Sequence, residues 1–118
     1  MGFAEAIKAG FSNYVAFSGR AIRSEFWYWV LFVILVEIVT SIIDYILGHQ
    51  ITTPLFGLAI FLPGLAVSIR RLHDTDRTGW WIFIGLIPLI GAILLIVWYC
   101  TRGTVGPNRY GPDLTPAG

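Results

Sequence analysis

One apolar segment limits what this chain can fold into more than any other feature. Residues 26–47 read FWYWVLFVILVEIVTSIIDYIL, and Glu37 and Asp44 are the charged side chains in that segment. As an α-helix it is about 33 Å long, enough to cross the ~30 Å hydrocarbon core of a bilayer. The aromatic residues 27–29 stand at its start, where an aromatic belt is expected. We therefore predict a first transmembrane helix over 26–47.

Two further apolar segments complete the predicted fold. We expect a second helix over 53–69 and a third over 79–100, which has aromatic residues at both ends. Pro88 and Gly91 interrupt the third segment, and a re-entrant hairpin there would return the chain to the side from which it came. The simple crossing is the preferred prediction, which gives an all-α membrane protein with three transmembrane helices.

The composition agrees with a membrane protein. Charged residues make up 13% of the chain and hydrophobic residues 56%, whereas a soluble domain has about 25% and about 45–50%. The net charge of +1 provides no broad basic surface, so we expect no nucleic-acid partner. The single Cys100 excludes an intramolecular disulfide and a multi-cysteine metal site. We expect one membrane domain, residues 1–118, without a cofactor or a metal.

The two ends of the chain have different patterns. In residues 2–17, apolar side chains such as Phe3, Ile7 and Phe11 recur at helical spacing. This pattern predicts a short amphipathic helix lying in the membrane interface. Residues 101–118 are rich in Gly and Pro and have no apolar period, which predicts an irregular tail.

The positive charges predict the orientation. With three crossings, the N-terminal segment and the 70–78 loop lie on one side and the tail on the other. The first side then holds six of the eight Lys and Arg residues. Because positive loops stay in the cytoplasm, we expect the N-terminus and the 70–78 loop inside and the tail outside.

The most polar stretch is RRLHDTDRTGWW, residues 70–81. One interpretation is the wet turn of a helical hairpin, in which the arginines reach phosphate head groups and the aspartates cap a helix or pair with arginines. A second interpretation is an anion-binding site. A third is a metal-dependent hydrolase site on His73, Asp74 and Asp76, although its spacing is not diagnostic. The candidate ligand-binding residues are Arg20, Arg23, Arg70, Arg71, His73, Asp74, Asp76 and Arg77.

A second candidate site lies inside the first predicted helix. Glu37, Thr40, Ser41 and Asp44 occupy one helical face, with Glu37 near the middle of the bilayer. A charge at that depth costs about 2.5–3.5 kcal/mol on insertion scales. The face can pack inward with Glu37 neutral and hydrogen-bonded across helices, or it can conduct ions or bind a ligand. Small residues on the second helix, Gly57 and Gly64 among them, allow close helix packing.

Four motifs resemble one known bacterial family. They are YVAFSGRAIRSEFWYW (14–29), RRLHDTDRTGWW (70–81), LIPLIGAILLI (86–96) and GTVGPNRYGPD (103–113). In this order they are similar to the family known as Domain of Unknown Function 805. The resemblance implies a small multi-pass protein of the bacterial inner membrane and implies no activity, because the family has none assigned.

These patterns favour a non-enzymatic membrane interaction or accessory module. Its Arg-rich cytoplasmic face is expected to engage anionic lipids or a partner protein. Three short helices bury little surface, so a homo-oligomer or a partner membrane protein is also expected. The alternative is a small oligomeric channel or carrier that uses the Glu37 face, and a lipid-head-group enzyme is the least favoured class.

Overall fold

The computed structural model describes residues 2–114 and is all-α, as predicted. Within this range, the only β-type pairing is an isolated bridge between Asn108 and Gly111. The helices, in chain order, are α1 (Phe3–Ser12), α2 (Arg23–Leu47), α3 (Thr52–Asp74), the 3₁₀-helix η1 (Gly79–Leu86) and α4 (Ile90–Cys100).

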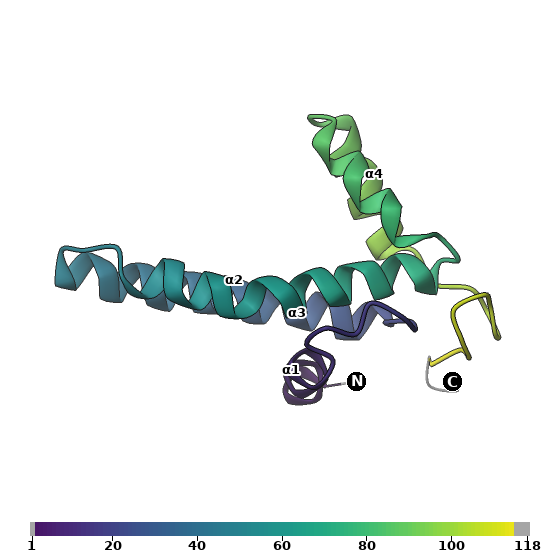
Figure 1. The fold of residues 1–118 in the computed structure, drawn as a ribbon, viewed down its shortest axis with the longest axis horizontal. Helices are drawn as coiled ribbons and strands as arrows, with labels where there is room; N and C mark the ends of the chain where they lie inside the picture. The colour runs from purple at the N-terminus through teal and green to yellow at the C-terminus, as the bar shows by residue number, and fades with distance from the viewer. Residues whose placement is uncertain (1, 115–118) are drawn as a thin grey trace.

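Helices α2 and α3 lie antiparallel and form a long hairpin (Figure 1). With 25 and 23 residues, both are long and apolar enough to cross a membrane. The predicted helices over 26–47 and 53–69 are therefore confirmed. The second one continues five residues further than predicted, so the RRLHD part of the polar motif is helical and not a loop.

The connection between α2 and α3 is held by a side chain from the end of α2. Gly48 adopts a left-handed conformation with φ of +76° and ends the helix. The Asp44 carboxylate accepts hydrogen bonds from the backbone N–H of Thr52 at 2.8 Å and of Thr53 at 2.9 Å. Asp44 thus satisfies two free donors at the start of α3.

The prediction of one continuous third helix over residues 79–100 is wrong. Residues 79–100 fold back on themselves as η1 and α4, and α4 is about 16 Å long, half the thickness of a hydrocarbon core. A Cβ atom on Gly91 would lie 1.7 Å from the carbonyl oxygen of Ile84, so the two helices approach closely because this residue is glycine. Leu89, with φ of +65°, completes the reversal. The interrupted segment therefore forms the hairpin that was the less favoured prediction.

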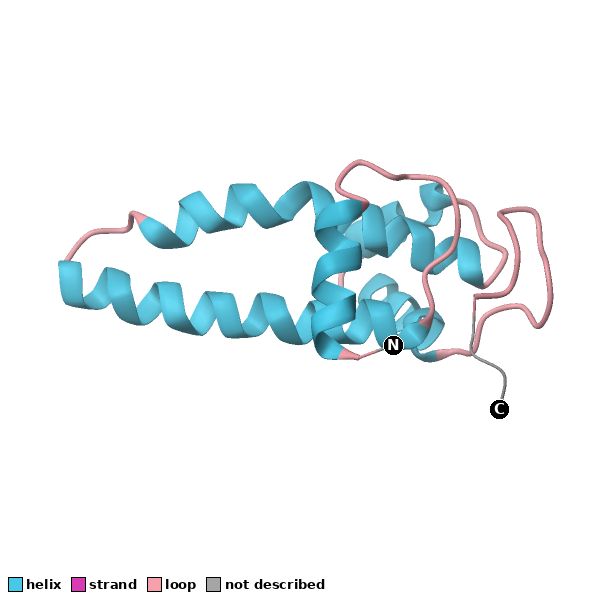
Figure 2. Ribbon diagram, turned by 90° about the horizontal axis from the view of Figure 1, so that it is seen from below, coloured by secondary structure: helices cyan, strands magenta, loops and turns pink. Residues whose placement is uncertain are grey.

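This reversal returns the tail to the end of the molecule that holds the 70–78 turn (Figures 1 and 2). Thr104 donates its backbone N–H to the carbonyl of Asp74 at 2.7 Å, and the Asn108 side chain donates to the carbonyl of His73 at 3.0 Å. These contacts contradict the prediction that the tail and this turn lie on opposite sides, because η1 and α4 replace the single continuous helix on which that prediction depended.

Helix α1 packs across α2 through small residues. Ala6 and Gly10 are buried, and a Cβ atom on Gly10 would lie 2.3 Å from the ring of Trp29. The predicted N-terminal helix is confirmed over residues 3–12, but it ends five residues earlier than expected. Its place in the membrane interface remains a prediction.

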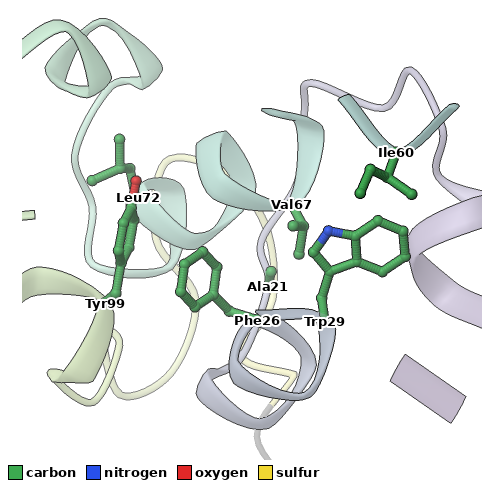
Figure 3. Packing of buried hydrophobic residues seen from close by; sticks show 7 residues of the cluster. All are labelled: Ala21, Phe26, Trp29, Ile60, Val67, Leu72 and Tyr99. Atoms are coloured by element: carbon green, nitrogen blue, oxygen red, sulfur yellow. The ribbon is translucent and has the colours of Figure 1, made fainter. Parts of the chain in front are cut away.

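The buried apolar cluster joins α2, α3 and α4 near the end where the tail lies (Figure 3). Phe26 and Tyr99 pack ring to ring with centroids 4.3 Å apart. This cluster fixes the helix ends that carry the polar residues described below. Its members are Ala21, Phe26, Trp29, Ile60, Val67, Leu72 and Tyr99.

Candidate functional site

At the end of the molecule where the tail meets the 70–78 turn, the polar residues form one compact unit. We call it the polar cap and define it as segments 18–25, 70–78 and 101–114. At its centre, Asp74 accepts from Arg20 Nε at 2.9 Å through Oδ1 and from Arg71 Nη1 at 2.7 Å through Oδ2. Both arginine side chains are 0% exposed and that of Asp74 is 1% exposed. One carboxylate therefore serves two buried guanidinium groups.

The Nη groups of Arg20 donate hydrogen bonds to backbone carbonyls of the tail. Nη1 donates to the carbonyls of Gly106 at 2.8 Å and Gly111 at 3.2 Å, and Nη2 donates to that of Thr104 at 2.6 Å. Hydrogen bonds from a charged donor are stronger than those between neutral groups. Arg20 thus fastens the tail to the helices from the inside.

Arg71 makes a similar set of contacts closer to α4. Its Nε donates to the carbonyl of Tyr99 at 3.1 Å, its Nη1 to that of Ala21 at 3.3 Å, and its Nη2 to that of Thr101. Carbonyl oxygens at the end of a helix carry partial negative charge, which suits a cation. Gly103 makes this arrangement possible, because a Cβ atom there would lie 1.9 Å from Asp74 Oδ2.

Arg70 belongs to a second buried pair. Its Nη1 donates to the Glu25 carboxylate at 3.1 and 3.3 Å, and both residues are 4% exposed. Arg70 Nε and Nη2 have no hydrogen-bond partner in the described chain. Sequence reasoning missed Glu25, although an acidic residue at the start of an apolar helix is a recognisable signal.

His73 connects the turn to both neighbouring segments. Its Nδ1 lies 2.9 Å from the carbonyl oxygen of Gly19, and its ring stacks on Tyr110 with centroids 3.9 Å apart and planes 3° from parallel. Asp76 and Arg109 pair at 3.1 Å on the outer surface. The hydrogen bond and the charge of Asp76 raise the pKa of Arg109 above its usual range. His73, Tyr110 and Arg109 therefore hold the tail on the turn.

Three cations around the polar cap lack a carboxylate partner among the described residues. Lys8 is exposed on α1, Arg23 donates to the carbonyl of Cys100 at 3.3 Å, and Arg77 lies 4.4 Å from the ring centroid of Trp98. The cap and α1 together contain all eight Lys and Arg residues of the chain but five of its seven Asp and Glu residues. This end is therefore the positive end of the molecule.

The four residues of the predicted intramembrane face, Glu37, Thr40, Ser41 and Asp44, do not form one site: two are buried and two are exposed. Asp44 caps α3, and Thr40 donates its hydroxyl to the carbonyl of Val36 at 2.8 Å. Ser41 and Glu37 are exposed, and the Glu37 carboxyl group makes no hydrogen bond or ion pair within the described chain. Glu37 therefore differs from the rest of this face, whose buried members complete the hairpin.

The structure thus brings together most of the predicted ligand-binding residues. Arg20, Arg71 and Asp74 meet directly, whereas Arg23 and Arg77 lie at the rim of the polar cap. Both oxygens of Asp74 are engaged by arginines, so this carboxylate is not free to act as a base or a ligand. In residues 2–114, no group of three His, Cys, Asp or Glu side chains is arranged to hold a metal ion.

Comparison with known proteins identifies the family. The family model "Protein of unknown function (DUF805)" matches residues 14–112, which include segments 18–25 and 70–78 of the polar cap and most of the tail. The chain belongs to the DUF805 family. The resemblance expected from the four sequence motifs is therefore confirmed.

Three of the proteins similar to this chain come from Escherichia coli. Inner membrane protein YhaH of strain K12 is 48% identical over 107 residues, which cover 86% of this chain and 88% of YhaH. Inner membrane protein YhaI of the same strain is 50% identical over 103 residues, covering 86% and 87%. The uncharacterized protein YiiR is 28% identical over 130 residues, covering 83% and 85%. No solved structure matches the chain.

Proposed function

We propose that this protein is a non-enzymatic module of the bacterial inner membrane whose polar cap, together with α1, binds anionic lipid head groups. The observation that carries the proposal is the concentration of all eight Lys and Arg residues at the end of an apolar hairpin. Cations at a membrane surface attract anionic lipids by about 1 kcal/mol for each residue.

The orientation that this function requires is supported by the same charges. Positive segments next to membrane helices stay in the cytoplasm. With the tail folded back, Arg102 and Arg109 add to the six cations already expected on that side. Two relatives are named inner membrane proteins, which supports the same membrane for this chain. We therefore assign the N-terminus, the turn and the tail to the cytoplasmic side.

The structure changes which arginines are available for lipid. Arg20, Arg70 and Arg71 are buried and face carboxylates or carbonyls of their own chain. Their role in the proposal is to hold the polar cap in shape. The lipid contacts are instead assigned to the cations that have no carboxylate partner in the described chain, Lys8, Arg23 and Arg77.

The test is the lipid preference of the reconstituted protein. Electron paramagnetic resonance of spin-labelled phosphatidylglycerol and phosphatidylcholine measures which lipid lies at the protein surface. We expect Arg23→Gln to lower the preference for phosphatidylglycerol by up to about fivefold, the equivalent of about 1 kcal/mol.

Arg109→Gln is the matched control, because it removes the same charge from a cation already paired with Asp76. We expect a smaller change for this variant. If a combined Lys8→Gln, Arg23→Gln and Arg77→Gln variant keeps the wild-type preference at low salt, the proposal is refuted.

Conduction through the Glu37 face is the rival function. It has less support, because the Thr40 hydroxyl donates to the carbonyl of Val36 on its own helix and the Asp44 carboxylate caps α3. A continuous polar path is therefore not formed by α2 of one chain. Wild-type liposomes that carry no ion or proton flux would count further against it.

A further inference from the structure

A groove runs between α2 and α3 in the middle of the hairpin. Its volume is about 460 Å³, and its walls are apolar apart from Glu37 and Ser68. All the residues that line the groove belong to α2 and α3, so neither η1 nor α4 covers it in the described chain. The groove is therefore an open face of the part of the protein that crosses the membrane.

Glu37 has no partner in this groove. It lies 14 residues from the start of α2 and ten from its end, about 21 Å and 15 Å along the helix. The hydroxyls of Thr40 and Ser68 donate to backbone carbonyls of their own helices, at 2.8 Å in each case. Every Lys and Arg of the chain lies in the polar cap or on α1. No side chain of the described chain thus donates to this carboxyl group.

A second polar group in the groove is also unsatisfied. Trp29 lines the groove and is 2% exposed, yet its Nε1–H has no acceptor in the described chain. An unpaired polar group away from water is unfavourable, and a carboxyl group in hydrocarbon is more so. Two such groups in one groove indicate that a single copy of the hairpin is incomplete.

We propose that the groove binds a second copy of this chain, with the two Glu37 carboxyl groups hydrogen-bonded to each other. Two copies inserted in the same direction and related by a two-fold axis place the same residue at the same depth. Neutral carboxyl groups are both donors and acceptors, so a pair of them satisfies both without any other molecule. The two hairpins then form a four-helix bundle.

Small residues leave room for this contact. A Cβ atom on Gly57 would meet nothing within 4 Å, and one on Gly64 would lie 3.4 Å from Trp29 Nε1. Small residues on a membrane helix allow a neighbouring helix to approach closely. Gly57 is therefore a position where a larger side chain fits the single copy but blocks the second one.

The contact can be mapped by disulfide cross-linking in native membranes. In a Cys100→Ser background, Ile34→Cys places a thiol on the groove and Val39→Cys places one on the opposite side of α2. We expect the Ile34→Cys protein to form dimers at least several times faster than the Val39→Cys protein. Equal rates at the two positions, or cross-links to other proteins alone, would overturn the proposal.

Association measured by fluorescence energy transfer in liposomes tests the role of Glu37. Glu37→Leu is expected to weaken the dimer about 3- to 30-fold, the range for hydrogen bonds between membrane helices. Glu37→Gln should keep most of the affinity, because two amide groups can also pair. Val39→Ala, an exposed position on the opposite side of α2, is the control and should have no effect.

Gly57→Leu provides an independent test that leaves Glu37 in place. We expect it to prevent dimer formation while helix content and thermal stability remain those of the wild type. The Glu37→Leu substitution favours membrane insertion, so a loss of association in that variant is not a loss of insertion. Wild-type affinity in both the Glu37→Leu and the Gly57→Leu proteins would overturn the proposal.

Discussion

Replacing Asp74 by Asn tests whether the polar cap holds the fold together. The carboxylate accepts from Arg20 at 2.9 Å and from Arg71 at 2.7 Å, and all three side chains are at most 1% exposed. Asn has the same shape but lacks the charge and turns one acceptor into a donor. The substitution leaves two buried guanidinium groups without their counter-ion.

The expected loss is large compared with the stability of a small protein. Removing one partner of a buried ion pair costs about 3–5 kcal/mol, whereas a whole domain is stable by about 5–15 kcal/mol. Asp76→Asn is the matched control, because the side chains of its pair with Arg109 are 43% and 58% exposed. Exposed pairs contribute about 0–1 kcal/mol.

The assay is reversible unfolding in mixed micelles with increasing dodecyl sulfate, followed by tryptophan fluorescence. The difference between the two variants in the free energy of unfolding should be at least about 2 kcal/mol. Trypsin cleavage after Arg102 should also be faster in Asp74→Asn, since the tail loses its attachment. If the two variants unfold within about 1 kcal/mol of each other, the assignment of Asp74 as the centre of the cap is refuted.

Three further predictions concern other parts of the chain. Gly91→Ala places a methyl group against the Ile84 carbonyl and should lower stability by about 1–3 kcal/mol in the same assay; wild-type stability would contradict the hairpin. Asp44→Ala removes the cap of α3 and should cost about 0.5–2 kcal/mol, whereas no loss would contradict that role. Thiol reagents should label Val105→Cys from the cytoplasmic side and His49→Cys from the other side; labelling of both from one side would refute the proposed topology.

Length and hydropathy are sufficient to predict α2 and α3, because a long apolar run can satisfy its backbone in a membrane only as a helix. The same criterion cannot distinguish a crossing from a return in 79–100. Both paths are compatible with the same apolar composition. The choice depends on the contact between Gly91 and the Ile84 carbonyl and on the left-handed conformation of Leu89, and both are tertiary features.

The polar cap was predictable only in some of its side-chain pairs, and the pair of Arg70 with Glu25 was missed. Opposite charges in the motif suggested that Asp74 pairs with arginines, and the structure confirms the pairs with Arg20 and Arg71. The tail contributes mainly through backbone carbonyls, such as those of Thr104 and Gly106. Every residue type carries a carbonyl group, so the sequence holds no sign of which ones an arginine will meet.

The attachment of the tail to Arg20 also imposes an order on biosynthesis. Arg20 and its acceptor Gly111 are 91 residues apart in the chain. At about 5–20 residues per second, the ribosome makes Gly111 about 5–18 s after Arg20. During that interval the guanidinium group has already been synthesised, but its tail carbonyls do not exist. Synthesis of residues 104–111 is thus the step that completes the set of tail acceptors for this guanidinium group.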